Sequence, residues 1–242
     1  MTTATGKRSI LVDVEGTIGS ISFVRDTLFP YARQALPAFV RARGGEPEVR
    51  ALLDSVAAEI GTTSDGTIIE TLQGWIDADS KHTALKALQG LIWRDGYASG
   101  AYVAHLYDDA VAKLREWHDA GHPIHVYSSG SVEAQRQFFA HTAAGDLTGI
   151  VSGHFDTGVG AKREVASYRA ILAELGVHGE AVTFVSDVVE ELDAAREAGM
   201  ATVLVDRRED YPEPREGTAT HGHARVESFI EIDPNVVEPD PA

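Results

Sequence analysis

The chain has 242 residues, 43% of them hydrophobic and 24% charged, and a formal net charge of −16. Such acidity argues against binding to nucleic acid or anionic lipid, so a polyanionic substrate would need a metal ion, a lysine or backbone amides beside it. The absence of cysteine excludes disulfides, zinc–thiolate sites and a cysteine nucleophile.

The beginning of the chain, MTTATGKRSI, lacks the apolar run of a signal peptide. No stretch approaches the ~20 apolar residues that a membrane span requires. We therefore expect a cytoplasmic protein, and a reducing compartment suits a chain without cysteine.

Five short apolar runs predict buried strands. They lack alternation of apolar and polar residues over most of their length, which is typical of a parallel sheet covered by helices on both faces. A further short strand is expected near residues 228–232. The five runs are residues 9–13, 123–128, 149–153, 182–187 and 201–206.

Helical patterns separate these strands in the second half of the chain. Residues 107–120 place Tyr107, Val111, Leu114 and Trp117 on one face, and Gly121 ends the pattern. Strand and helix alternate from residue 123 onward, which predicts a doubly wound α/β sheet. The other expected helices cover residues 131–141, 162–175 and 189–198.

Residues 19–100 contain no convincing strand and are too long for a simple crossover connection. We interpret them as a helical cap domain inserted after the first strand. The catalytic α/β core would then consist of residues 1–18 and 101–242. The expected cap helices are residues 23–42, 47–60, 67–79 and 81–93.

Polar residues follow the predicted strands. In an open parallel sheet, ligands bind beyond the carboxyl ends of the strands, so these side chains should converge on one crevice. They are Asp13 and Glu15 after the first strand, Ser128 and Ser129 after the second, Lys162 past the third, and Asp187 after the fourth.

This combination suits phosphoryl transfer. The carboxylate of Asp13 can attack phosphorus and hold the group as an aspartyl phosphate. Asp13 and Asp187, with the backbone carbonyl of Glu15, can supply oxygen ligands to Mg²⁺. A serine hydroxyl and the ammonium of Lys162 can bind the phosphoryl oxygens, and Glu15 can act as general acid and base.

The motifs resemble those of the haloacid dehalogenase-like hydrolases, which share a DxE-type strand end (residues 11–15), a strand-end serine (Ser128), a lysine (Lys162) and an acidic strand end (Asp187). The second acid is glutamate here, where the phosphatases of that family usually have aspartate. Longer stretches are similar to the enolase-phosphatase family of methionine salvage. They are VDVEGTIGSISFVRDTLFPYAR, YSSGSVEAQ, GDLTGIVSGHFDTGVGAKREVASYRAI, FVSDVVEELDAAREAG and IWRDGYASG.

The resemblance implies a reaction. That family enolises 2,3-diketo-5-methylthiopentyl-1-phosphate and then hydrolyses the ester to 1,2-dihydroxy-3-keto-5-methylthiopentene and phosphate. It implies one Mg²⁺ per subunit, a monomer, and a small phosphate ester as substrate. We expect neither nucleic acid nor a membrane as a partner. The implied metal positions are Asp13, Glu15 and Asp187, and the implied substrate positions are Ser128, Ser129 and Lys162.

Several alternatives remain open from the sequence. Glu15 is the first candidate for the enolisation base, but a histidine or water could serve. The chain could be another capped Mg²⁺-dependent phosphatase of the same superfamily, or a non-catalytic metal- or phosphate-binding module. A histidine metal site is a further alternative, because HPIH at residues 122–125 and HGH at residues 221–223 are present.

Overall fold

The computed structural model describes residues 7–235. The chain divides into two compact units: one runs up to Ile21 and resumes at Ala104, and the other is Ser22–Val103. We call them the core unit and the helical unit. The sequence places these breaks after residues 18 and 100. Across residues 7–235, no helix is both long and apolar enough to cross a membrane.

Within the described residues, the core unit is built on a six-stranded sheet in the order β3-β2-β1-β4-β5-β6, with every neighbouring pair parallel. This confirms the doubly wound α/β fold. Such a strand order brings the carboxyl ends of β1 and β4 together where the winding reverses. The strands are β1 (Ser9–Val12), β2 (Ile124–Tyr127), β3 (Gly153–Phe155), β4 (Val182–Ser186), β5 (Ala201–Val205) and β6 (Ala224–Val226).

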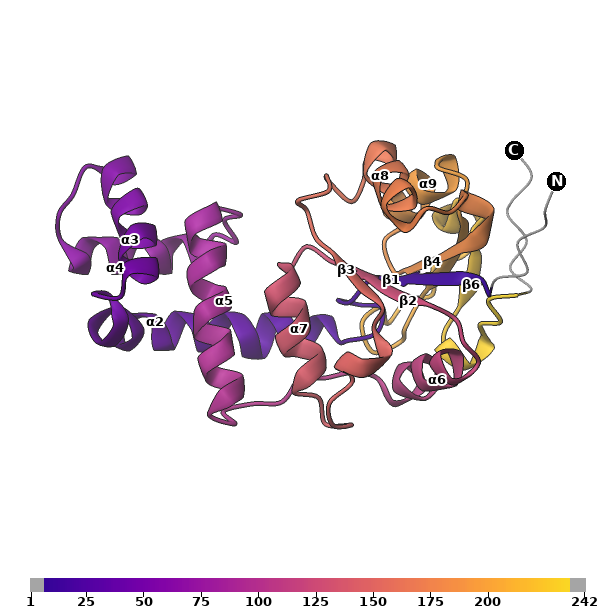
Figure 1. The fold of residues 1–242 in the computed structure, drawn as a ribbon, viewed down its shortest axis with the longest axis horizontal. Coiled ribbons are helices and arrows are strands. Elements are labelled where there is room, and N and C mark those ends of the chain that lie inside the picture. Colours follow the sequence, from indigo (N-terminus) through magenta and orange to yellow (C-terminus); the bar gives the residue numbers. More distant parts are fainter. Residues whose placement is uncertain (1–6, 236–242) are drawn as a thin grey trace. The chain divides into compact units, whose positions relative to one another are not determined.

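Helices cover both faces of this sheet: α8 and α9 lie on one side and α6 on the other (Figure 1). Leu11 and Phe184 are fully buried in the cluster that includes residues of α8 and α9, so these two helices cover one face of the central strands. The helices are α6 (Asp108–Asp119), α7 (Val132–Ala140), α8 (Val165–Leu175) and α9 (Val189–Glu197).

Two predicted strands are misplaced. The third was expected at residues 149–153, but Thr148–Ile150 is a 3₁₀ turn and β3 begins at Gly153. The carboxylate of Asp146 accepts hydrogen bonds from the backbone and hydroxyl of Thr148, which favours the turn. The strand expected at residues 228–232 is also wrong: Phe229–Glu231 is a 3₁₀ turn, started by a capping box between Ser228 and Glu231.

The helix expected at residues 162–175 begins later than predicted. Helix α8 starts at Val165, so Lys162 lies in the loop between β3 and α8 rather than on a helix. That loop holds Gly160 at a φ of 139°. The backbone carbonyl of Lys162 accepts a 2.7 Å hydrogen bond from the hydroxyl of Tyr168, which fixes the loop onto the helix.

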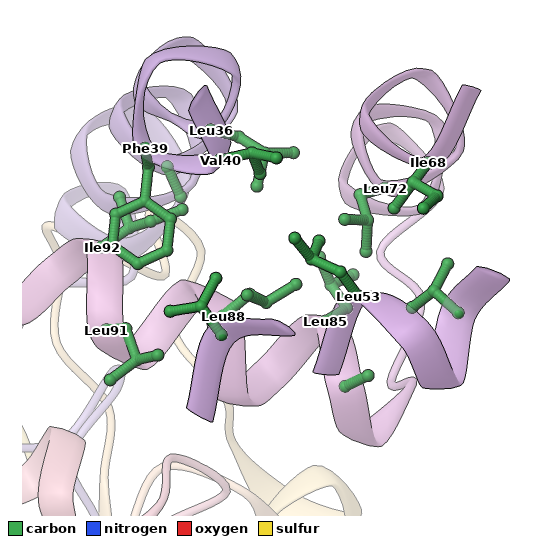
Figure 2. Packing of buried hydrophobic residues seen from close by; sticks show 14 residues of the cluster. Leu36, Phe39, Val40, Leu53, Ile68, Leu72, Leu85, Leu88, Leu91 and Ile92 are labelled. Atoms are coloured by element: carbon green, nitrogen blue, oxygen red, sulfur yellow. The ribbon is translucent and has the colours of Figure 1, made fainter. Parts of the chain in front are cut away.

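The helical unit has its own apolar core. Figure 2 shows leucine, isoleucine, valine and phenylalanine side chains from its helices packed against one another. Gly61 ends α3 in the left-handed conformation, and the hydroxyl of Ser64 caps α4. Helix α1 (Ile21–Phe23) begins at the last residue of the core unit and continues into the helical unit. The other elements are a π-helical turn (Val24–Leu28), α2 (Phe29–Arg43), α3 (Pro47–Ile60), α4 (Asp65–Asp77) and α5 (Thr83–Ala98).

Candidate active site

The candidate site lies at the reversal point of the sheet. Asp13 directly follows β1 and Asp187 directly follows β4. The backbone amide of Asp13 donates to the carbonyl of Val185 over 3.0 Å, so the two strand ends are in register. Asp13 is 4% exposed and Asp187 2% exposed. The structure thus brings together the two acids that the sequence assigned to one crevice.

Lys162 contacts two carboxylates inside this site. Its Nζ lies 2.5 Å from Oδ1 of Asp13 and 2.7 Å from Oε2 of Glu191. Burial alone would lower the pKa of Lys162, but the charges of Asp13 and Glu191 outweigh it and raise that pKa to about 12. Lys162 is therefore a fixed positive charge beside the Asp13 carboxylate.

Glu191 was missed by the sequence reasoning. It lies on α9, is 7% exposed, and accepts a 3.3 Å hydrogen bond from the hydroxyl of Ser186. Burial and the charge of Asp13 raise the pKa of Glu191 to about 7, although Lys162 opposes the rise. Glu191 follows Asp187 by four residues, and this spacing could have pointed to it. The neighbouring Glu190 is exposed, so only the register of α9 decides which of the two glutamates faces the site.

The carboxylate of Asp187 is held at both oxygens. Oδ1 accepts from the hydroxyl of Thr17 over 3.1 Å, and Oδ2 accepts from the hydroxyl of Tyr211 over 2.6 Å. Thr17 also accepts from the backbone amide of Asp187 over 2.9 Å. Burial and the charge of Asp13 raise the pKa of Asp187 to about 6, although the hydrogen bonds from Tyr211 and Thr17 act in the opposite direction.

The loop after β1 requires glycine at position 16. Gly16 has a φ of 77°, in the region that favours glycine, and a Cβ there would overlap the Asp187 carboxylate. Its amide donates to the carbonyl of Gly19 over 2.7 Å, which closes the loop. Glu15 lies on this loop with its side chain exposed, so it is the accessible acid of the set.

The two serines follow β2. Ser128 is half-buried, its amide donates to the carbonyl of Phe155, and its hydroxyl accepts from the amide of Gly130 over 3.2 Å. Ser129 is exposed. Their hydroxyls and the amides around Gly130 therefore lie at the carboxyl end of the strand next to β1, as the parallel sheet requires.

Gln135 and Asp156 hold this serine loop in place, and neither was among the predicted site residues. The buried amide of Gln135 donates to the carbonyls of Gly130 (2.9 Å) and Phe155 (2.7 Å). Asp156 accepts from the amides of Val132 and Gly158 over 3.1 and 2.7 Å. Both residues lie in stretches that are similar to the enolase-phosphatase family. Those stretches therefore include residues that position the loop as well as residues that could take part in the chemistry.

The donor set suits a hard divalent cation. Across residues 7–235 no group of three or more His, Cys, Asp or Glu side chains is arranged to hold a metal. An ion here would instead have the carboxylates of Asp13 and Asp187 with backbone carbonyls and water, which is how Mg²⁺ is commonly bound. Burial and the charge of Asp13 raise the pKa of Asp187, and a cation between the two acids would relieve their repulsion.

The histidine motifs serve other contacts. Nδ1 of His122 lies 2.8 Å from the carbonyl of Arg8. His221 and His223 both bind the carboxylate of Asp193, at 2.6 and 3.0 Å, and Nδ1 of His223 contacts the hydroxyl of Thr202. Within the described part of the chain, these groups form no set of metal ligands.

Comparison with known proteins agrees with this geometry. The family model for haloacid dehalogenase-like hydrolases matches residues 7–199. A protein from Stenotrophomonas maltophilia (strain K279a), named enolase-phosphatase E1, is 60% identical and covers 93% of this chain and 98% of its own length. The chain belongs to the enolase-phosphatase E1 family of haloacid dehalogenase-like hydrolases. It is accordingly an enzyme of the hydrolase class.

Two further proteins extend the match. An enolase-phosphatase E1 from Xylella fastidiosa (strain M23) is 54% identical over 93% of this chain and 97% of its own. The crystal structure of the UTR4 protein from Saccharomyces cerevisiae has a TM-score of 0.79 and 31% identity, covering 94% of this chain and 100% of that one. The resemblance inferred from the motifs is confirmed.

Proposed function

We propose that this chain is a bifunctional enolase-phosphatase of L-methionine salvage. Its substrate is 2,3-diketo-5-methylthiopentyl-1-phosphate, and its products are 1,2-dihydroxy-3-keto-5-methylthiopentene and phosphate. One observation carries the proposal: Lys162 lies 2.5 Å from Asp13 at the reversal point of the sheet, in a chain that is 60% identical to an enolase-phosphatase E1.

In the phosphatase step, an oxygen of Asp13 attacks phosphorus and the bond to the enol oxygen breaks, giving an aspartyl phosphate. Lys162 and the hydroxyls of Ser128 and Ser129 stabilise the charge on the phosphoryl oxygens. Glu15 protonates the leaving enol oxygen. Glu15 then takes a proton from the water that attacks the aspartyl phosphate and releases inorganic phosphate.

In the enolase step, a proton leaves the carbon that bears the phosphate ester, next to a carbonyl, and the carbonyl oxygen takes up a proton from water to give the enol. We assign Glu15 as the base, because its carboxylate is exposed on the loop after β1. Glu191 has a pKa near 7, but it is 7% exposed and bound to Lys162, so it suits the role of a partner that positions Lys162 better.

Mg²⁺ is the proposed cofactor, one per subunit, held by the carboxylates of Asp13 and Asp187 and the backbone carbonyl of Glu15. When bound, it supplies positive charge that polarises the enolate and phosphoryl oxygens. We further propose that the protein is a cytoplasmic monomer that acts on this small phosphate ester and binds neither nucleic acid nor a membrane. We also propose that the helical unit is a cap domain.

The test is turnover of the diketone phosphate with and without Mg²⁺, following enol absorbance and phosphate release together. Asp13→Asn should release no phosphate, whereas Asp146→Asn, which affects only a surface turn, should behave like the parent. Glu15→Gln should lose both half-reactions. Phosphate released without a preceding enol would favour another phosphatase of the superfamily, and inactivity towards every phosphate ester would favour a binding module.

Enol formation by Glu15→Gln at the parental rate would reassign the base to another group, such as a histidine or water. Full phosphatase activity in Asp13→Asn would remove the nucleophile assignment.

A further inference from the structure

Both oxygens of the Asp187 carboxylate carry a hydroxyl donor. Thr17 donates to Oδ1 over 3.1 Å and Tyr211 donates to Oδ2 over 2.6 Å. Thr17 belongs to the loop after β1, but Tyr211 comes from the segment after β5, where the sequence shows no motif. Two donors on opposite oxygens fix the rotation of the carboxylate plane, because turning it would break one bond or the other.

Tyr211 is itself held rigidly. The guanidinium of Arg215 stacks on its ring, with Cζ 3.9 Å from the ring centroid. Arg215 donates through Nε to Oδ1 of Asp206 over 2.7 Å and through Nη1 to the backbone carbonyl of Asp187 over 2.5 Å. Asp206 is fully buried at the end of β5. The same arginine thus binds the backbone of Asp187 and orients the tyrosine that binds its side chain.

We propose that Tyr211 is a positioning residue for the metal site, its hydroxyl fixing the orientation in which Asp187 presents its carboxylate to Mg²⁺. This inference rests on the proposed function, which assigns Asp187 to the metal. Groups that orient a metal ligand typically change metal affinity about 10–100-fold when removed, without contacting the metal. Tyr211 acts through Asp187 and not on the substrate.

The chain contains a closely matched control. Tyr107 is also half-buried, its hydroxyl donates to Oδ2 of Asp210 over 2.7 Å, and the guanidinium of Arg207 stacks on its ring at 4.0 Å. The two tyrosines therefore share a carboxylate acceptor and an arginine partner. They differ in that Asp210 is not among the proposed metal ligands.

The experiment measures the Mg²⁺ dissociation constant by calorimetry, without substrate, for the parent chain and the variants Tyr211→Phe, Tyr107→Phe and Asp187→Asn. Phenylalanine keeps the ring on its arginine and removes only the hydroxyl. We expect Tyr211→Phe to weaken Mg²⁺ binding about tenfold or more, and Tyr107→Phe to change it less than twofold. In turnover, Tyr211→Phe should raise the half-saturating Mg²⁺ concentration while leaving KM for the ester at saturating Mg²⁺ unchanged.

The rise in melting temperature on adding Mg²⁺ gives a second readout, which works even in a variant of lower stability. A ligand that binds the folded state stabilises it more when it binds more tightly. Parental Mg²⁺ affinity in Tyr211→Phe, with affinity lost in Asp187→Asn, would overturn the role of Tyr211. Equal weakening in both tyrosine variants would also overturn it. Parental affinity in Asp187→Asn would instead refute the metal assignment of the proposed function.

Discussion

Nζ of Lys162 lies 2.5 Å from Oδ1 of Asp13, and the two residues are 8% and 4% exposed. A buried ammonium at that distance neutralises the proposed nucleophile before a phosphate ester arrives. It also occupies the position from which a cation can bind phosphoryl oxygens during transfer. The contact therefore has consequences for both folding and catalysis.

Lys162→Met should reveal these consequences when it is compared with the same change at a lysine outside the site. We expect kcat/KM to fall about 100-fold or more, since one preorganised donor is commonly worth that much. The free energy of unfolding should fall by about 3–5 kcal/mol, because Asp13 and Glu191 remain buried without their cation. Lys113→Met is the control: Lys113 pairs with Glu116, which is largely exposed, so the loss should stay under about 1 kcal/mol. Unchanged kinetics in Lys162→Met would contradict its role.

Glu191 gives the metal-free protein a specific pH dependence. Its pKa is raised from 4.5 to about 7 in the folded state, so the folded protein binds this proton more tightly than the unfolded chain. The stabilisation is complete below about pH 4.5 and is lost as pH rises through 7.

Urea unfolding in a chelator, at pH 5 and pH 8, tests this dependence. The free energy of unfolding of the parent, relative to that of Glu191→Gln, should be lower at pH 8 than at pH 5. The decrease should be at most about 1.4 kcal/mol per pH unit. Glu190→Gln, exposed on the same helix, is the control and should have a small effect at both. A parent–Glu191→Gln difference that is equal at both pH values would contradict the expectation.

Gly16→Ala should disturb Asp187 directly. Position 16 has a φ of 77°, and the new Cβ would overlap the Asp187 carboxylate. Gly176→Ala isolates the backbone effect, because Gly176 has a φ of 68° with nothing within 4 Å of a Cβ. The control should lose about 1–2 kcal/mol of stability and keep its activity. Gly16→Ala should lose more stability and most activity. Equal effects in the two variants would show that the close approach is unimportant.

Gln135→Leu should loosen the serine loop, because two carbonyls lose their amide donor. We expect inhibition by inorganic phosphate to weaken about tenfold, which corresponds to roughly 1.4 kcal/mol. Gln137→Leu is the control on the same helix, since Gln137 donates only to the exposed Glu133. Parental phosphate inhibition in Gln135→Leu would leave Gln135 with a purely structural role.

The sequence predicts the central strands well, because an apolar run that ends in a polar residue indicates both a buried strand and the side chain at its carboxyl end. Asp13 and Asp187 follow strands buried on both faces, so the parallel sheet alone places them together. β3 is harder, because it is three residues long and lies next to a turn started by Asp146. The local hydrogen bond, rather than the apolar pattern, decides where that strand begins.

The supporting residues of the site could not be found this way. Tyr211 lies in a segment rich in proline and glutamate with no periodicity, and its role depends on Arg215 and Asp206 lying nearby in space. Glu191 required the register of α9, which decides between two adjacent glutamates. The sequence reveals candidate site residues such as Asp13 and Asp187 because they follow predicted strands. The residues that orient them are brought to the site only by tertiary contacts.

The strand order also dictates when the site can form during synthesis. Ile10 of β1 pairs with Ile124 of β2 and with Thr183 of β4, so β1 cannot complete its pairing until β4, a much later strand, has been made. The helical unit packs on its own apolar core in the meantime. Because closure of long loops is slow, we expect the helices of Ser22–Val103 to gain protection from hydrogen exchange before β1 does. Asp13 is made long before Asp187, so the proposed nucleophile can enter its site only after Asp187 has been added to the chain.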